Sequence, residues 1–112
     1  MNTVCDRILA KDERIGFAMI VNQEGHIVES KTRGPLLMPK EDIAALAGVW
    51  TIIIGGVGKQ MEKYFGRFEV NLLGYEKVSV YGVMLRNRTI VISARKDLPM
   101  ETVLSLKKIE ED

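Results

Sequence analysis

The sequence predicts an α+β domain in which a five-stranded antiparallel sheet carries one long helix on one face and the terminal helices on the other. Two observations lead to this prediction. Apolar or alternating runs typical of strands fall into two groups, of two and three, on either side of a long helical stretch. Turn signals join the strands within each group, as in hairpins. The expected order is α-β-β-α-β-β-β-α.

Length and composition predict a single soluble domain spanning residues 1–112. Hydrophobic residues make up 46% and charged residues 28% of the chain, with a net charge of +1, which does not favour nucleic acid or a membrane surface as partner. The single cysteine, Cys5, and the lack of a signal peptide favour the cytoplasm. The apolar run 49–57 is far shorter than the roughly 20 residues of a membrane span.

The first helix and strand have clear local signals. Thr3 and Asp6 have the spacing of a capping box, which predicts a short helix over residues 4–12. Residues 15–21 are almost wholly apolar, which is typical of a strand covered on both faces.

A tight turn over residues 22–25 should follow, because Gly25 can adopt positive φ. Residues 26–30 then form the partner strand. Residues 31–38 are expected to be a loop, broken by Gly34 and Pro35.

Residues 39–65 predict one long helix. Pro39 suits its first turn, and Glu41 and Asp42 suit the positive end of the helix dipole. Gly66 suits the position after its last residue. A bulky apolar row at spacings of three and four is expected to pack on the sheet. This row is Ile43, Leu46, Trp50, Ile53, Val57 and Tyr64.

A second row on the same helix consists of small residues. Glycine inside a helix costs about 1 kcal/mol relative to alanine, so several in one row suggest that another backbone comes close. We expect this row to face a second helix. Its members are Ala44, Gly48, Thr51, Gly55 and Gly58.

The last part of the chain predicts three strands and a helix. Phe68, Val70 and Leu72 alternate with polar residues over 68–72, as in a strand with one solvated face. Strands over 78–85 and 89–94 follow, and a final helix over 99–109 begins at Pro99.

Three segments carry a resemblance to a known family: ILAKDERIGFAMIVNQEGHIV over residues 8–28, the Phe65-Gly66 helix end, and YEKV over residues 75–78. With this element order, the chain resembles the roadblock (dynein light chain) superfamily, which has a profilin-like fold. Within that superfamily it looks like small roadblock-like proteins of ammonia-oxidising archaea. The glycine cluster around Gly56 is denser than in that family's helix, which leaves open a kink or an early helix end.

The resemblance implies a homodimer without a cofactor. Its long helices would pack together through the small row, and its third strands would pair edge to edge at Phe68, Val70 and Leu72. It also implies a regulatory or scaffolding role, often on small Ras-like GTPases.

The segment Gly55-Gly56-Val57-Gly58-Lys59 imitates a phosphate-binding loop. Such a loop needs Ser or Thr after the lysine to hold Mg²⁺, and Gln60 stands there instead. We therefore expect helix packing here, with nucleotide binding as an alternative.

No pattern predicts a catalytic, cofactor or metal site. His26 is the only histidine, and we expect it to face solvent. Cys5 is expected to be a small buried residue without a partner for nucleophilic chemistry.

Basic residues concentrate in the last three strands. Edge protection is one interpretation, and a docking patch for an acidic partner is the other. The candidate patch is Lys77, Tyr81, Arg86, Arg88 and Arg95.

The sequence thus predicts a non-enzymatic, homodimeric interaction module, a regulator or scaffold in signalling. The alternative is a small-molecule sensor with a cavity between sheet and helix, for which Ser79, Tyr81 and Ser93 are the available polar groups.

Overall fold

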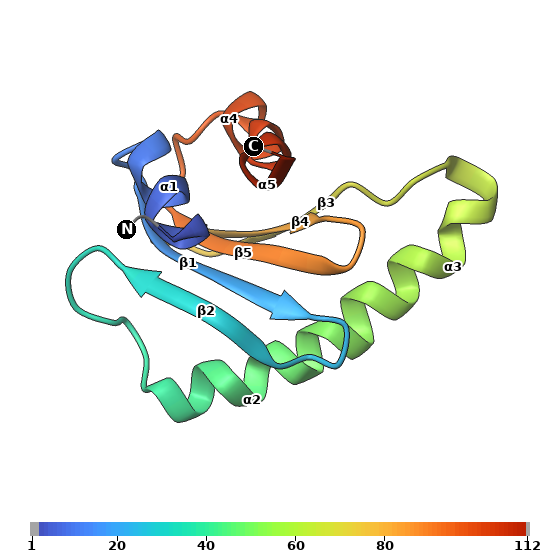
Figure 1. Ribbon diagram of the computed structural model, residues 1–112, viewed down its shortest axis with the longest axis horizontal. Helices are drawn as coiled ribbons and strands as arrows, with labels where there is room; N and C mark the ends of the chain where they lie inside the picture. The colour runs from blue at the N-terminus through green and yellow to red at the C-terminus, as the bar shows by residue number, and fades with distance from the viewer. Residues whose placement is uncertain (1–2, 112) are drawn as a thin grey trace.

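Five antiparallel strands form one sheet in the order β2-β1-β5-β4-β3 (Figure 1). The computed structural model describes residues 3–111. The strands are β1 (Ile15–Asn22), β2 (Ile27–Thr32), β3 (Val70–Gly74), β4 (Ser79–Met84) and β5 (Arg88–Ala94). The predicted fold class and element order are confirmed. The largest shift concerns β3, which begins at Val70, so that Phe68 lies outside the strand.

The long helix lies on one face of the sheet and the terminal helices lie on the other, as predicted (Figure 1). The terminal helices are α1 (Val4–Lys11), α4 (Met100–Ser105) and α5 (Lys107–Glu111). The predicted single helix at the end of the chain is therefore two short helices. The break falls at Leu106, which is fully buried and whose N–H donates to the carbonyl of Val103 (3.1 Å).

Strand register places alternate residues in two separate cores. Ile20 pairs with Ile90, and their side chains belong to the large cluster beneath α1, α4 and α5. Met19 pairs with Val91, and their side chains belong to a much smaller cluster beneath the long helix. Most of the chain's buried apolar side chains therefore lie on the side of the terminal helices.

Local signals in the sequence are confirmed. Thr3 Oγ1 accepts the N–H of Asp6 and Asp6 Oδ2 accepts the N–H of Thr3, both at 3.1 Å, which completes the capping box. Gly25 (φ +86°) turns the chain between β1 and β2, and Gly66 (φ +90°) ends the long helix. Cys5 is buried and His26 is exposed, as expected.

The long helix runs without interruption through α2 (Lys40–Trp50), a π-helical turn η1 (Thr51–Gly55) and α3 (Gly56–Phe65). Gly56 has ordinary helical angles (φ −62°, ψ −51°), so the helix neither ends nor breaks there. In Figure 1, α3 continues past the ends of the strands, on the side of the β1–β2 and β4–β5 turns. Within residues 3–111, Lys40–Phe65 is the helix that is long and apolar enough to cross a membrane by length and composition.

Candidate interaction surface

The outward face of the long helix exposes a continuous series of large apolar side chains. They follow one another along α2, η1 and α3 at helical spacing, and each exposes about half or more of its surface. They are Leu46 (51%), Val49 (51%), Ile53 (55%), Val57 (58%) and Tyr64 (73%), with Ile52 (76%) and Phe65 (78%) beside them. Contiguous apolar surface of this kind marks an interaction site. We call it the helix face.

The helix face corrects one prediction from the sequence. Leu46, Ile53, Val57 and Tyr64 were expected to pack on the sheet, but each exposes half or more of its surface. Trp50 of the same row is half-buried. Ile43 alone of that row joins the small cluster against the sheet, beside the fully buried Ala47.

The small residues of the helix lie mainly toward the chain's own sheet. A Cβ built on Gly25 would lie 3.0 Å from Gly48 Cα, so the backbone that comes close to Gly48 is the β1–β2 turn of the same chain. A Cβ built on Gly58 would lie 2.0 Å from Phe68 Cδ2. Gly48 and Gly58 are therefore occupied from within the protomer and are not available to a second helix.

The other members of the small row have different surroundings. Ala44 is exposed, and a Cβ on Gly55 would meet nothing within 4 Å. Thr51 is half-buried, and its Oγ1 donates to the carbonyl of Ala47 (2.9 Å). For Ala44, Thr51 and Gly55 the contact with a second copy stays a prediction.

The edge of the sheet at β3 adjoins the helix face. Along residues 3–111, β3 pairs with β4 on one side and with no strand on the other. Leu72 is 47% exposed, whereas Val70 packs against the large core. Phe68, predicted as an edge-strand residue, instead packs on Gly58 of α3.

A groove of about 450 Å³ separates α3 from the start of β3. Ile53, Val57, Met61 and Val70 line it, together with Phe68. The groove joins the helix face to the β3 edge, so the two form one surface.

The candidate basic patch is not a single surface. Lys77 lies in the β3–β4 turn and Arg95 follows β5, at one end of the β4–β5 hairpin, whereas Arg86 and Arg88 lie at the opposite end. Tyr81 is 3% exposed and belongs to the large core. The prediction of one docking patch that includes Tyr81 is therefore wrong.

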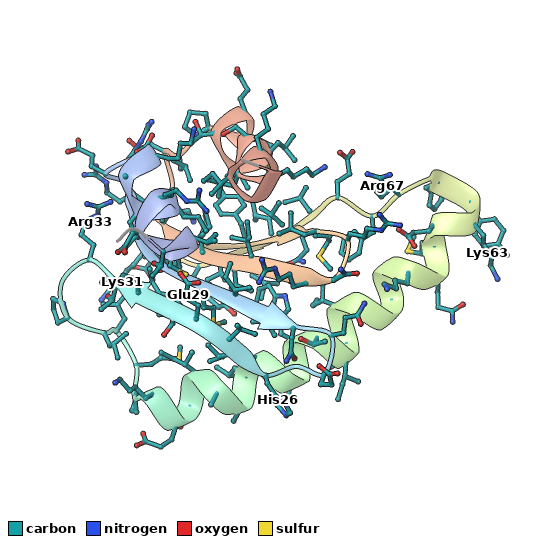
Figure 2. The ribbon with its side chains drawn as sticks, in the orientation of Figure 1. His26, Glu29, Lys31, Arg33, Lys63 and Arg67 are labelled. Carbon is teal, nitrogen blue, oxygen red and sulfur yellow. The ribbon has the colours of Figure 1, made fainter. Side chains whose placement is uncertain are left out.

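Charged side chains elsewhere serve the fold. Glu29 Oε1 accepts the N–H of Cys5 (2.7 Å), and Figure 2 shows Glu29 and Lys31 on the side of β2 that faces α1. Burial, with the nearby Glu29 carboxylate, raises the pKa of the Cys5 thiol to about 12, which removes its nucleophilic form at neutral pH. Side-chain and backbone hydrogen bonds from Arg14 lower the pKa of Asp12 to about 2.

The segment that imitates a phosphate-binding loop is helical. Gly55 has φ −63° and ψ −42°, and the Gly56 N–H is directed to the carbonyls of Ile52 and Ile53. A phosphate-binding loop presents free N–H groups to the phosphates, and here they serve the helix. The nucleotide-binding alternative is therefore rejected.

A second hollow, of about 380 Å³, lies between β1, β2 and the first turns of α2, in the layer between sheet and helix where the sensor alternative needs a cavity. Phe17, Ile27 and Ile43 supply apolar walls, and Thr32 and Lys40 supply polar groups. The polar residues named for a sensor do not line it: Ser79 and Tyr81 are buried elsewhere in the sheet. The loop before α2, which closes this hollow through Leu36, carries no sequence signal for it.

No family model and no curated protein match the chain. Solved structures do match. MglB from Myxococcus xanthus is 18% identical with a TM-score of 0.75, covering 96% of this chain and 86% of that one. A Roadblock/LC7 domain from Streptomyces avermitilis is 6% identical with a TM-score of 0.75, covering 96% and 90%. A structure described as MglB with tetrameric arrangement is 17% identical with a TM-score of 0.72, covering 96% and 85%. At these identities the likeness shows the fold, and the chain has the roadblock/LC7 fold.

Proposed function

We propose that this chain of roadblock fold is a non-enzymatic, homodimeric interaction module that regulates or scaffolds signalling proteins in the cytoplasm. The observation that carries the proposal is the helix face with the β3 edge beside it. Half-exposed aliphatic side chains at helical spacing lie next to a strand with unpaired backbone groups. A second copy supplies both an apolar helix and a strand edge, so one partner satisfies both halves of the surface.

Burial of the helix face against a second copy explains why a folded chain carries so many apolar side chains on its surface. Fully burying an aliphatic side chain contributes about 1.5–3 kcal/mol, and each residue of the helix face has about half of its surface left to bury. A two-fold axis brings the same patch of both copies together, so one surface suffices. The similar MglB structure with tetrameric arrangement supports self-association of this chain.

Sedimentation equilibrium tests the dimer. A protomer of 12.6 kDa should sediment at twice that mass. Val57→Glu on the helix face should shift the equilibrium to monomer, because it places a charge in the interface. The matched control is Val28→Glu on β2, since Val28 (56%) and Val57 (58%) are the same residue type at nearly equal exposure.

A parent chain that stays monomeric would contradict the proposal. So would a Val57→Glu variant that associates as tightly as Val28→Glu. Sedimentation with phospholipid vesicles tests the other occupant of an exposed apolar helix: binding to vesicles by a monomeric parent would assign the helix face to a membrane instead.

The expected partner beyond the second copy is a small Ras-like GTPase, which the family resemblance implies. Calorimetric titration of the dimer with a small GTPase of the same organism, loaded with GDP or with a GTP analogue, tests this. Binding that differs between the two nucleotide states supports a regulator. A lack of binding in both states would remove the GTPase from the proposal and leave the homodimeric scaffold.

A small-molecule sensor is the second candidate, favoured by the hollow of about 380 Å³ beneath α2. Lys40 at its rim and the apolar walls suit a small anion with an apolar body. A thermal-shift screen of such metabolites should find a stabilising compound, and Ile43→Trp should abolish the shift by filling the hollow. A screen without any stabilising compound would reject this candidate.

A further inference from the structure

The ring of Phe68 lies directly on the backbone of α3 at Gly58. A Cβ built on Gly58 would lie 2.0 Å from Phe68 Cδ2 and 2.1 Å from Cε2. No side chain fits in that space while the ring stays in place. The contact therefore requires glycine at position 58, and the same change at Gly55 or Gly56 would meet nothing within 4 Å.

Two hydrogen bonds hold the chain in this arrangement between α3 and β3. Glu62 Oε2 accepts the N–H of Phe68 (2.9 Å), and the carbonyl of Glu62 accepts the N–H of Gly66 (2.8 Å). Gly66 reverses the chain with φ +90°, a conformation that favours glycine. We call Gly58, Glu62, Gly66 and Phe68 the latch.

The residue after the latch is fixed to the sheet and to α5. The carbonyl of Glu69 accepts the N–H of Met84 (2.9 Å), and its carboxylate pairs with Lys107 Nζ (2.6 Å). The latch thus joins the end of the long helix to an anchored point beside β3. In Figure 2, Arg67 lies on this connection, between the end of α3 and the sheet.

Gly58, Glu62 and Phe68 also line the groove that joins the helix face to the β3 edge. The two halves of the candidate surface lie on opposite sides of this groove. A second copy that contacts both halves at once requires a fixed angle between α3 and β3, because its own helix and strand are equally fixed.

We infer that the latch sets the angle between α3 and β3 and thereby positions the helix face and the strand edge for simultaneous contact with a second copy of this chain. Phe68 is then a positioning residue for self-association. The inference rests on the proposed homodimer and adds to it the residues that determine its geometry. The competing view is that the latch only stabilises the protomer.

A double-mutant cycle separates these views. Gly58→Ala, Phe68→Leu and the double variant are compared with the parent by sedimentation equilibrium. Gly56→Ala is the control, because it is the same change in the same helix at an open glycine outside the small row. Gly58→Ala and Phe68→Leu should each weaken the dimer by about tenfold or more, equivalent to about 1.4 kcal/mol. The dimer of the double variant should dissociate no more readily than the dimer of the more strongly affected single variant, because both changes break the same contact. Gly56→Ala should keep the parent's dissociation constant.

Urea unfolding of the dissociated protomers measures protomer stability, which the variants would lower if the latch only stabilised the protomer. The midpoints of the single variants should stay close to the parent's, because most of the protomer's core lies on the other face of the sheet. NMR tests the contact itself: the ring of Phe68 should shift the Gly58 Hα signals upfield, and Phe68→Leu should remove the shift.

The outcomes are distinguishable. A dimeric parent whose Gly58→Ala and Phe68→Leu variants retain its dissociation constant would overturn the latch and leave the proposed function in place. Equal weakening by Gly56→Ala, or a loss of protomer stability that matches the loss of association, would also overturn it. A parent that is monomeric throughout would overturn the homodimer, and the latch with it.

Discussion

Gly25→Ala is expected to destabilise the protomer strongly, because two independent costs fall on one residue. Gly25 has φ +86°, and its added Cβ would lie 3.0 Å from Gly48 Cα and 3.6 Å from the Gly48 carbonyl oxygen. The positive φ costs an L-residue about 1–2 kcal/mol. The overlap adds about 1–3 kcal/mol, since the neighbour is backbone and cannot rotate away.

The expected total is about 2–5 kcal/mol, a large part of the roughly 5–15 kcal/mol by which such domains are stable. Gly34→Ala is the matched control. Gly34 has nearly the same φ (+88°), but a Cβ there meets nothing within 4 Å. Gly34→Ala should therefore show only the cost of the positive φ.

Urea denaturation followed by Trp50 fluorescence measures both variants. The protomer concentration is held constant, because association adds to apparent stability. The difference between the two variants isolates the contact between the β1–β2 turn and α2. Equal destabilisation by both variants would show that Gly48 does not face Gly25, and the orientation assigned to the long helix would be wrong.

Three further predictions concern the end of the molecule near α1. Thr3→Ala removes the cap that accepts the Asp6 N–H and should cost about 1 kcal/mol in urea denaturation, with Thr3→Ser retaining most of the stability. Asp12 has a pKa of about 2 in the folded chain against an ordinary 3.8, so its stabilising effect is complete above about pH 5 and is lost as the pH falls through 3.8 toward 2. Asp12→Asn should flatten that part of the acid-denaturation profile, and an unchanged profile would contradict the bond to Arg14. Burial raises the pKa of Cys5 to about 12, so a thiol reagent at pH 8 should label it only when the chain unfolds. Rapid labelling of the folded chain would show that Cys5 is accessible.

Structural features that depend only on residues close together in the chain were predictable from the sequence. The capping box of Thr3 and Asp6 and the positive φ of Gly25 and Gly66 follow from side chains or glycines within a few positions of the turn or helix end. The hairpins follow from such signals, whereas the pairing of β1 with β5, which sets the strand order, joins residues far apart in sequence and was not predicted. The break at Leu106 was missed, because the N–H of Leu106 bonds to the carbonyl three residues back and no residue type in this segment signals that change.

The orientation of the long helix could not be predicted in the same way. Periodicity separates a bulky row from a small row, but it does not say which residues of each row meet the sheet. Burial within a chain and burial between two chains favour the same apolar residues. What decides is the close approach of the Gly25 turn to Gly48, a contact between residues far apart in sequence.

The length of a strand explains why the candidate basic residues do not form one patch. Lys77 and Arg86 flank β4, a strand of six residues, which spans roughly 20 Å at about 3.3 Å per residue. Residues at opposite ends of a strand do not share a small docking site. The sequence pattern around Tyr81 predicted a strand but not the face to which its side chain belongs. Its pairing with Leu72 and Ile92 in the sheet places it in the core.

The unequal cores on the two faces of the sheet connect the fold to the proposed function. The terminal helices enclose a large cluster that includes Ile8, Ile90 and Leu106, so folding of the protomer depends mainly on that face. The long helix encloses only a small cluster around Ala47 and Val91, and its outer side chains bury little within one chain. Substitutions on the helix face should therefore change association much more than protomer stability, whereas substitutions beneath α1 should do the reverse. A protomer that folds on one face and docks with the other can lose its partner without unfolding, as a regulated interaction module requires.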